Sequence, residues 1–394
     1  MLLINLSPLY IRCGAILSNS DTLEKELENF KERFIYINPE INISYNEKKL
    51  ILFKINYFKI DDFKKSPDYE FLLKIKIIQN INLEEKDKEI IEEKILIYKD
   101  SNEILLEPRI KNKGIPTCYY CGELSGRREY IIYKLFQKKC EKLGDLIKLS
   151  ISGIDYINNM LQNPFFNLPK ETINDLVIVG KGKDNNSKLT KEKKNCLSFK
   201  EKLYPYLLST GEDGISIYQV NSINSFKKLG YNTLGPTSLW SLFNLACNYE
   251  DPELALKEAT EGNNELIDLS VGDIYGGDYG GASLCSDIIA SSFSKLVNVD
   301  NIDKLDKKDI GRALLIFYGF TYAQVASMFP SQEKIDKNII SGDTFNSLEL
   351  KQMIQVSLEG LTGNAIGCIF SDYSNYFEII GMVSELDKTG LLKI

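Results

Sequence analysis

Hydrophobic and polar residues alternate along the first hundred positions in a way that is typical of short β-strands. Apolar segments at 2–16, 34–45 and 50–58 predict strands, and turns rich in Asn and Glu separate them. The apolar segment 71–78 is compatible with either a strand or a helix. From 127 to 160, apolar residues recur at intervals of three to four, which predicts helix.

The same order of elements returns in the second half of the chain. Strands are predicted at 203–209, 215–220, 226–229 and 338–341. Helices are predicted at 238–248, 252–261, 286–297, 308–329 and 348–360. A strand followed by a helix is expected at 376–386. Because strands followed by helices occur twice, we expect a duplicated α/β fold with an N-terminal lobe at 1–160 and a C-terminal lobe at 203–394.

Between the predicted lobes, residues 161–202 have the composition of an insertion or linker. The segment begins with a turn-like stretch at 163–167 and becomes rich in lysine over 181–200. Gly180-Lys-Gly-Lys183 lacks the spacing of a phosphate-binding P-loop, so a flexible basic loop is the better interpretation. We interpret the segment as low-complexity filler in preference to a partner-docking element.

Composition excludes several kinds of chemistry. The chain of 394 residues contains no histidine, so a Ser-His-Asp triad, a histidine metal ligand and an imidazole proton shuttle are all excluded. Any general base is therefore a carboxylate, lysine, tyrosine or thiolate. A net charge of −7 gives no support for nucleic-acid binding.

Targeting and metal signals are weak. No apolar run reaches the roughly 18 residues of a membrane span, and Met1–Leu9 predicts a strand in preference to a signal peptide. We therefore expect a cytoplasmic protein with reduced cysteines. The one CxxC pair, Cys118–Cys121, lacks a second pair at matching spacing, so we expect no metal site.

One motif in the second half is too specific to reflect composition. Asp273-Ile-Tyr-Gly-Gly-Asp-Tyr279 is followed ten residues later by Ala290-Ser-Ser-Phe293. This pair closely resembles the DIYGGDY and VASSFG motifs of the type II pantothenate kinases. Further segments that align with that family are Tyr204–Ser216, Lys227–Ser238, Pro252–Ala259, Asp309–Ala313 and Tyr376–Gly381. The resemblance is good over 200–386 and loose over 118–160.

The resemblance implies a fold, a reaction and an assembly. The implied fold is the two-lobed actin-like, sugar-kinase-type ATPase fold, built from duplicated ribonuclease-H-like lobes. The implied reaction is ATP- and Mg²⁺-dependent phosphorylation of pantothenate, the first step toward coenzyme A. The family is also dimeric, which implies a homodimer or heterodimer through residues 273–297.

The family's phosphate loops are altered in this chain. Where the family has DIGGT, this chain has Asn5–Leu9, with both glycines lost, although the next basic position is kept as Arg12. The GSG loop reads Glu212-Asp213-Gly214. Two carboxylates thus stand where the polyphosphate would lie. A like-charge pair about 4 Å apart repels by roughly 4 kcal/mol at an effective dielectric constant near 20, so this turn opposes a polyphosphate unless magnesium is bound. The FVGN loop reads Ile340–Asp343 and keeps Gly342.

The substrate loop and the catalytic base are altered as well. GTSLGGG keeps one glycine, Gly235, and the preceding arginine is Lys228, which lacks the bidentate fork. The glutamate of KLDELD aligns with Asp145 or Leu146, depending on the direction of reading. Asp145 is one methylene shorter, and misplacement by about 1 Å can cost roughly a hundredfold in rate. Glu378 stands where the family has a glycine beside the nucleotide.

The resemblance assigns candidate roles to individual residues. The candidate catalytic base is Asp145. The candidate substrate-binding residues are Ser216, Lys228, Tyr275, Tyr279, Ile289 and Ala290, of which the last four wall the pocket of the opposite protomer in the family. The candidate nucleotide-binding residues are Arg12, Gly214, Gly235 and Gly342.

Three functional hypotheses follow from a conserved DIYGGDY motif beside altered phosphate loops. The first is a non-catalytic or regulatory subunit, a pseudokinase, that completes the pantothenate pocket of an intact paralogue. The second is a divergent but active pantothenate kinase, with Asp145 as the base, Lys228 and Ser216 on the substrate, and Arg12 near the phosphate. The third is a sensor that binds pantothenate or coenzyme A without turnover. Under a purely structural interpretation, Tyr275 and Tyr279 are interface core.

Overall fold

The computed structural model describes most of the second half of the chain and the strands of the first half. The described residues are 2–6, 10–17, 41–45, 48–56, 58–59, 69–79, 89–98, 118–121, 141–169, 194–211, 214–249, 252–280, 285–298, 305–329, 335–342 and 348–389. They form two compact units, Met1–Ile157 with Tyr376–Ile394, and Asn158–Asn375. The first unit ends close to the expected boundary at 160, but it also includes the C-terminal helix, and the segment 161–202 belongs to the second unit.

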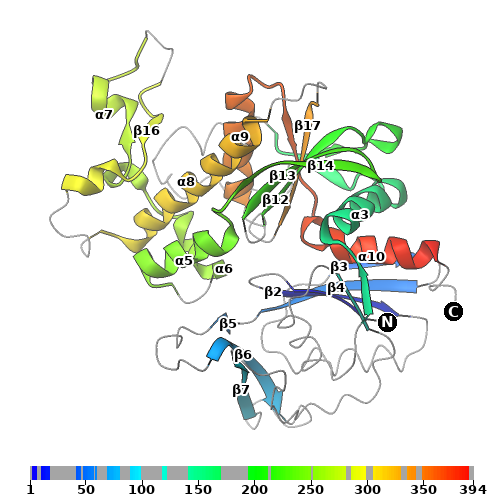
Figure 1. Cartoon of the computed structure of the whole chain (residues 1–394). Helices are drawn as coiled ribbons and strands as arrows, with labels where there is room; N and C mark the ends of the chain where they lie inside the picture. Colours follow the sequence, from blue (N-terminus) through cyan, green and yellow to red (C-terminus); the bar gives the residue numbers. More distant parts are fainter. Residues whose placement is uncertain are drawn as a thin grey trace. The chain divides into compact units, whose positions relative to one another are not determined.

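Six described strands of the first unit form a mixed sheet with the order β3-β4-β2-β1-β8-β9. Of these, β2, β3 and β4 are labelled in Figure 1. The strands are β1 (Leu2–Leu6), β2 (Tyr10–Leu17), β3 (Ile41–Tyr45), β4 (Lys48–Asn56), β8 (Cys118–Cys121) and β9 (Glu141–Gly144). β1 pairs antiparallel with β2 and parallel with β8, and β9 lies parallel to β8. β9 departs from the prediction of helix throughout 127–160.

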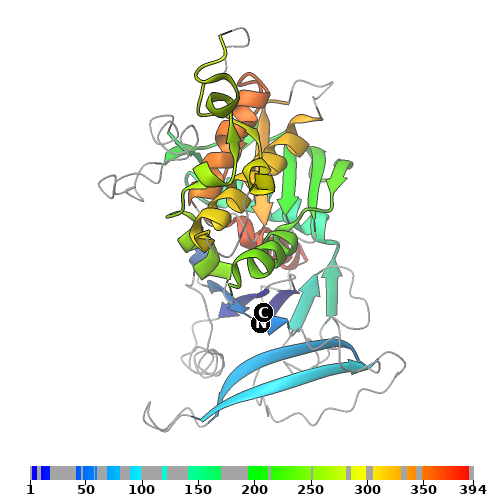
Figure 2. The same cartoon turned by 90° about the vertical axis from the view of Figure 1, so that its left-hand side faces the viewer.

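A separate antiparallel sheet contains β5 (Phe58–Lys59), β6 (Tyr69–Gln79) and β7 (Glu89–Tyr98). The segment 71–78, for which the sequence left strand and helix open, is therefore part of a strand. Its residues pair with β7 over nearly the whole length of both strands (Figure 2).

Two helices of the first unit, α3 (Leu146–Met160) and α10 (Phe377–Lys388), pack closely because each has a glycine at the contact. A Cβ at Gly153 would overlap the carbonyl of Phe377, and a Cβ at Gly381 would overlap the carbonyl of Leu149. α10 also contacts β1, β2 and β8. The strand expected at the start of 376–386 is wrong, because a 3₁₀ turn, η8 (Ser374–Tyr376), leads directly into α10.

The second unit has a five-stranded sheet with the order β14-β13-β12-β17-β18. The strands are β12 (Tyr206–Gly211), β13 (Ile215–Ser222), β14 (Ser225–Asn232), β17 (Lys337–Gly342) and β18 (Gly367–Ile369). β12, β13 and β14 form an antiparallel meander, and β17 and β18 add parallel to β12. This is the same topology as β4-β2-β1-β8-β9 of the first unit. The predicted fold of duplicated ribonuclease-H-like α/β lobes is thus confirmed.

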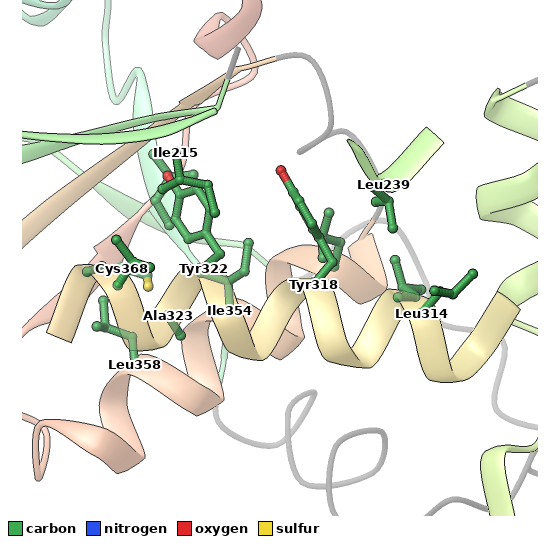
Figure 3. Packing of buried hydrophobic residues seen from close by; sticks show 14 of the residues in the cluster. Ile215, Leu239, Leu314, Tyr318, Tyr322, Ala323, Ile354, Leu358 and Cys368 are labelled. Carbon is green, nitrogen blue, oxygen red and sulfur yellow. The ribbon is translucent and has the colours of Figure 1, made fainter. Parts of the chain in front are cut away.

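The core of the second unit lies between this sheet and its helices. The helices are α5 (Pro236–Cys247), α6 (Pro252–Ala259), α8 (Lys307–Ser327) and α9 (Leu348–Leu361). Along α8, Tyr318 and Tyr322 are one helical turn apart, and Tyr322 lies beside Ile215 of β13 (Figure 3). The buried Tyr322 hydroxyl donates a hydrogen bond of 2.9 Å to the carbonyl of Ser209, so the polar end of this large side chain is satisfied by the sheet backbone.

A small group of elements stands beyond α8, away from the five-stranded sheet (Figure 1). It contains η4 (Asn264–Leu266), β15 (Leu269–Ser270), α7 (Val271–Tyr275), β16 (Ile289–Ser291) and η5 (Ser294–Asn298). We call the described residues 263–280 and 285–298 the aromatic module. The helix predicted at 286–297 is wrong, because this segment pairs with β15 and then turns.

The ends of the predicted insertion are anchored to the second unit. β10 (Phe165–Asn167) pairs antiparallel with β11 (Asn195–Leu197), and a 3₁₀ turn, η3 (Lys200–Lys202), follows. The backbone of Phe166 exchanges two hydrogen bonds with Phe370, which follows β18. The most lysine-rich part, including Gly180–Lys183, lies outside the described residues.

Candidate functional site

Two predicted nucleotide-binding glycines lie at one edge of the five-stranded sheet. β12 ends at Gly211 and β17 ends at Gly342, and these two residues pair in the parallel register. Gly214 follows β12 in the turn that leads into β13. We call Gly211, Gly214 and Gly342 the glycine edge. In open α/β sheets, ligands bind beyond the carboxyl ends of parallel strands, and this edge has that position.

Each of the two predicted glycines fills a place that no larger residue fits. Gly342 has φ = +129°, and a Cβ there would overlap the backbone of Gly211. A Cβ at Gly214 would overlap the ring of Tyr231 and the carbonyl of Asn232. The Tyr231 ring therefore lies directly against the turn at Gly214. Glu212, Asp213 and Asp343 lie outside the described residues.

The candidate substrate residues Ser216 and Lys228 lie on neighbouring strands close to this edge. Ser216 is buried in β13 and pairs in register with Tyr231 of β14. The Lys228 Nζ lies 4.5 Å from the ring centroid of Tyr231 and 5.9 Å from that of Tyr218. Lys228 thus makes cation–π contacts with two tyrosines of its own unit.

Gly235 begins α5 but has no conformational need for glycine. Its backbone is extended, with φ = −101°, and Pro236 occupies the first helical position. The Asn232 side chain accepts a hydrogen bond of 2.8 Å from the Leu234 N–H, which stabilises the turn before the helix. The fold therefore places Gly235 at a helix N-terminus, close in sequence to Lys228 and Tyr231.

The candidates in the first unit are Asp145 and Arg12. Asp145 is exposed just before α3, and its Oδ1 accepts hydrogen bonds from the N–H groups of Ile147 at 3.0 Å and Lys148 at 3.2 Å. It is therefore the N-cap of α3, and its role as a base stays a prediction. Arg12 pairs in β-register with Asn5 and Lys54, and its side chain lies outside the described residues.

Glu378 does not point into open space. This residue is buried in the first turn of α10, and the Ser150 hydroxyl of α3 donates to its Oε1 at 2.7 Å. The expectation that Glu378 presents a bulky anion to a nucleotide gains no support from this contact. The side chain instead contributes to the packing of α3 against α10.

The remaining candidates belong to the aromatic module, where a capping box starts α7. The Ser270 hydroxyl accepts from the N–H of Asp273 at 3.1 Å, and an Asp273 carboxylate oxygen accepts from the N–H of Ser270 at 2.8 Å. Lys295 forms an ion pair of 2.6 Å with Asp273. The Lys295 ammonium and the Ser270 donors together lower the pKa of Asp273 to about 2. α7 is therefore tied to η5.

Two tyrosines lie exposed at the end of α7. Tyr275 and Tyr279 are 55% and 40% exposed, and their rings stack with centroids 4.3 Å apart. Gly276 between them ends the helix in the left-handed region, with φ = +76° and open space where a Cβ would stand. On β16, Ala290 is exposed and Ile289 is partly buried. The other large apolar side chains that the module leaves exposed are Leu266, Ile274, Ile288 and Val297.

Sequence reasoning missed Asp268, which organises this module. Its buried carboxylate accepts hydrogen bonds from the Phe293 N–H at 2.8 Å and from the Asn264 amide at 2.6 Å. Burial raises the pKa of Asp268, although both donors oppose the shift. The first contact turns the chain at Phe293, which has φ = +59°, and so explains why 286–297 is no helix. An aspartate five residues before the DIYGGDY motif was the available signal.

Three general properties of the described residues bear on function. Among them, no group of three or more Cys, Asp or Glu side chains is arranged to hold a metal ion. None of the helices that the structure describes has the length and apolar character required to cross a membrane. Of the cysteines with described side chains, Cys13, Cys196, Cys247, Cys285 and Cys368 form no disulfide.

Comparison with known families identifies the chain. It matches the family described as Fumble over residues 74–385. The chain belongs to the Fumble family. These are the type II pantothenate kinases that the DIYGGDY motif indicated.

Relatives match the chain over shorter stretches. A pantothenate kinase of Schizosaccharomyces pombe is 27% identical over 183 residues, which are 45% of this chain and 45% of that protein. Pantothenate kinase 2 of Arabidopsis thaliana is 33% identical over 126 residues, 32% of this chain and 14% of that protein. A 4'-phosphopantetheine phosphatase of Mus musculus is 26% identical over 180 residues, 45% of this chain and 22% of that protein. The matched region spans less than half the length of each relative.

Two solved structures are similar at low identity. A glucokinase from Balamuthia mandrillaris in complex with glucose is 9% identical with a TM-score of 0.38, and 98% of this chain and 92% of that chain are covered. An activator of 2-hydroxyisocaproyl-CoA dehydratase from Clostridium difficile with bound ADPNP is 10% identical with a TM-score of 0.35, covering 82% and 94%. At these scores neither structure supports an argument about this chain.

Proposed function

We propose that this Fumble-family chain is a cytoplasmic, non-catalytic or regulatory subunit of a heteromeric pantothenate kinase. It would dimerise through residues 273–297 with a paralogue whose phosphate loops are intact. Its Tyr275, Tyr279, Ile289 and Ala290 would then complete the pantothenate pocket of that paralogue.

The observation that carries this proposal is the exposed tyrosine pair. Tyr275 and Tyr279 stack at the surface of the second unit, and the same module has several other exposed apolar side chains. Exposed aromatic and aliphatic groups gathered on one small module are typical of a protein–protein interface. A DIYGGDY motif that builds such a surface favours a role in assembly.

The glycine edge supports the second half of the proposal, the loss of catalysis. Tyr231 replaces the first glycine of the family's GTSLGGG motif, and its ring lies against Gly214. Lys228 contacts the same ring. A phosphate loop needs backbone N–H groups open to the ligand, and a tyrosine ring beside the turn opposes that approach. If the chain were active, ATP and Mg²⁺ would be the expected cofactors, as in the family reaction.

The test is phosphorylation of labelled pantothenate by the purified chain with Mg²⁺ and ATP at high enzyme concentration. We expect no turnover by the chain alone, and activity that exceeds that of the paralogue alone when the two chains are combined. Turnover of roughly 1 per second or more by the chain alone would sink the subunit proposal and make Asp145 the first residue to mutate.

Matched variants separate a contributed pocket from simple stabilisation. Tyr279→Ala should abolish the gain in activity, whereas Phe320→Ala, which removes a similarly exposed aromatic ring on α8, should preserve it. Equal loss in both variants, or no association of the chains in gel filtration, contradicts the model. Binding of pantothenate or coenzyme A by the chain alone, without ATP binding, would support the sensor hypothesis instead.

A further inference from the structure

Two lysines share one aromatic ring at the anchored ends of the insertion. The ring belongs to the buried Phe166 of β10, which packs against Phe370 with centroids 6.0 Å apart. The Nζ atoms of Lys194 and Lys351 lie 4.3 Å and 5.6 Å from the Phe166 ring centroid. The Phe166 ring thus lies near the side-chain nitrogens of two lysines, one from the residue before β11 and one from α9.

The carboxylate of Asp372 is already paired with one of the two lysines. Lys194 Nζ lies 2.7 Å from both carboxylate oxygens of Asp372. Among the residues that the structure describes, Lys351 has no ion pair, although its side chain on α9 is partly buried. The amine of Lys351 is therefore only partly solvated, and it lies near the charged amine of Lys194.

These surroundings favour the neutral amine of Lys351. Burial lowers its pKa to about 8, the Asp372 carboxylate opposes this shift, and the Lys194 ammonium adds to it. At pH 7.5 roughly a quarter of such an amine is unprotonated, compared with about 0.1% of an ordinary lysine with a pKa near 10.4. An unprotonated amine is the nucleophilic form.

We propose that Lys351 is a site of acylation by thioesters, held ready by the division of charge between Lys194 and Asp372. The neutral Nζ attacks the carbonyl carbon of the thioester, and a C–N bond forms as the C–S bond breaks. The thiolate leaves and takes up the proton that the amine releases. The products are an amide at Lys351 and a free thiol, so no oxidant or reductant is needed.

The charge of the product favours an acyl group over carbon dioxide as the electrophile. An amide is neutral and therefore suits a partly buried position beside an aromatic ring. A carbamate would be a new anion near the Asp372 carboxylate. Lys194 could not readily neutralise it, because Lys194 is already paired with Asp372. The cluster thus matches an activated acyl group better.

The experiment treats the full chain with S-acetyl-N-acetylcysteamine and follows each lysine by peptide mass spectrometry. At pH 7.5 we expect Lys351 to react on the order of tenfold faster than the exposed Lys257, because its larger free-amine fraction outweighs its lower basicity and partial burial. The rate at Lys351 should level off above about pH 8, whereas that at Lys257 should keep rising. Equal rates at the two lysines would overturn the proposal.

Two surface variants test the geometry with opposite signs. Lys194→Gln frees Asp372 to pair with Lys351, so acetylation of Lys351 at pH 7.5 should slow several-fold. The pH above which the acetylation rate levels off should also rise. Asp372→Asn removes the opposing carboxylate, so acetylation should quicken. Circular dichroism checks that both variants fold. Changes of the same direction in both variants would show that the charge division does not control Lys351.

Discussion

At the glycine edge, backbone and aromatic atoms occupy the space in which a Cβ of Gly214 or Gly342 would stand. In the aromatic module of the same unit, Gly276 has open space around it, and the two tyrosines beside it are exposed. One region is closed by its own backbone and side chains, and the other presents side chains outward. The surroundings of a motif's glycines therefore indicate what the motif does. A glycine that is closely packed serves the fold, whereas a glycine in open space leaves room for a partner.

The largest expected difference between the two regions is the loss of stability when one of their glycines is replaced by alanine. Gly342→Ala should destabilise the chain by about 3 kcal/mol or more, since it combines a left-handed φ with overlap on Gly211. Gly276→Ala has only the left-handed φ to accommodate and should cost about 1 kcal/mol. Urea unfolding measures both, with Gly277→Ala as a control at a site that also has open space. Similar costs for Gly342→Ala and Gly276→Ala would remove the distinction between the regions.

The next effect concerns the module alone. Asp268→Ala should leave the Phe293 N–H and the Asn264 amide without their acceptor, at a local cost of about 2 kcal/mol. Hydrogen exchange should therefore speed up in the module while the five-stranded sheet stays protected. Asp287→Ala, which removes an exposed carboxylate of the same module, serves as the control. Faster exchange in the sheet as well would mean that the module is not a separate cooperative region.

The smallest effect is a pH dependence of the Asp273–Lys295 ion pair. The folded pKa of Asp273, about 2, lies below the ordinary value near 3.9, so the pair stabilises the fold above about pH 4 and is lost as the pH falls through 2. The thermal midpoints of the wild type and Asp273→Asn should accordingly differ at pH 5 and converge by pH 2. A difference that stays constant over this range would show that the stabilisation does not depend on the charge of Asp273. Asp287→Asn should match the wild type at both pH values.

Local patterns along the chain were enough to predict much of the second unit. The strands expected at 203–209, 215–220 and 226–229 overlap β12, β13 and β14, and the helix expected at 308–329 overlaps α8. These elements are long and periodic, and short turns join the three strands, so sequence-local physics determines them. The order of strands in the two sheets depends on pairing between distant segments. The repetition of strands and helices predicted the fold class but not this order.

The errors came from contacts between distant residues. The helix predicted at 286–297 fails because Asp268 accepts the Phe293 N–H, an interaction over 25 positions. In the same way, no local signal in the sequence placed the Tyr231 ring against Gly214 or turned Glu378 toward Ser150. The motif located the module, but no pattern in the sequence predicted that its two tyrosines stack at the surface.

The packing of α10 in the first unit has a consequence for the order of synthesis. The second unit, 158–375, interrupts the first unit in the sequence, and the glycine contact between α3 and α10 joins residues on both sides of the interruption. At translation rates of roughly 5–20 residues per second, α3 leaves the ribosome at least about ten seconds before α10. Throughout that interval the face of α3 at Gly153 lacks the helix that covers it in the folded chain.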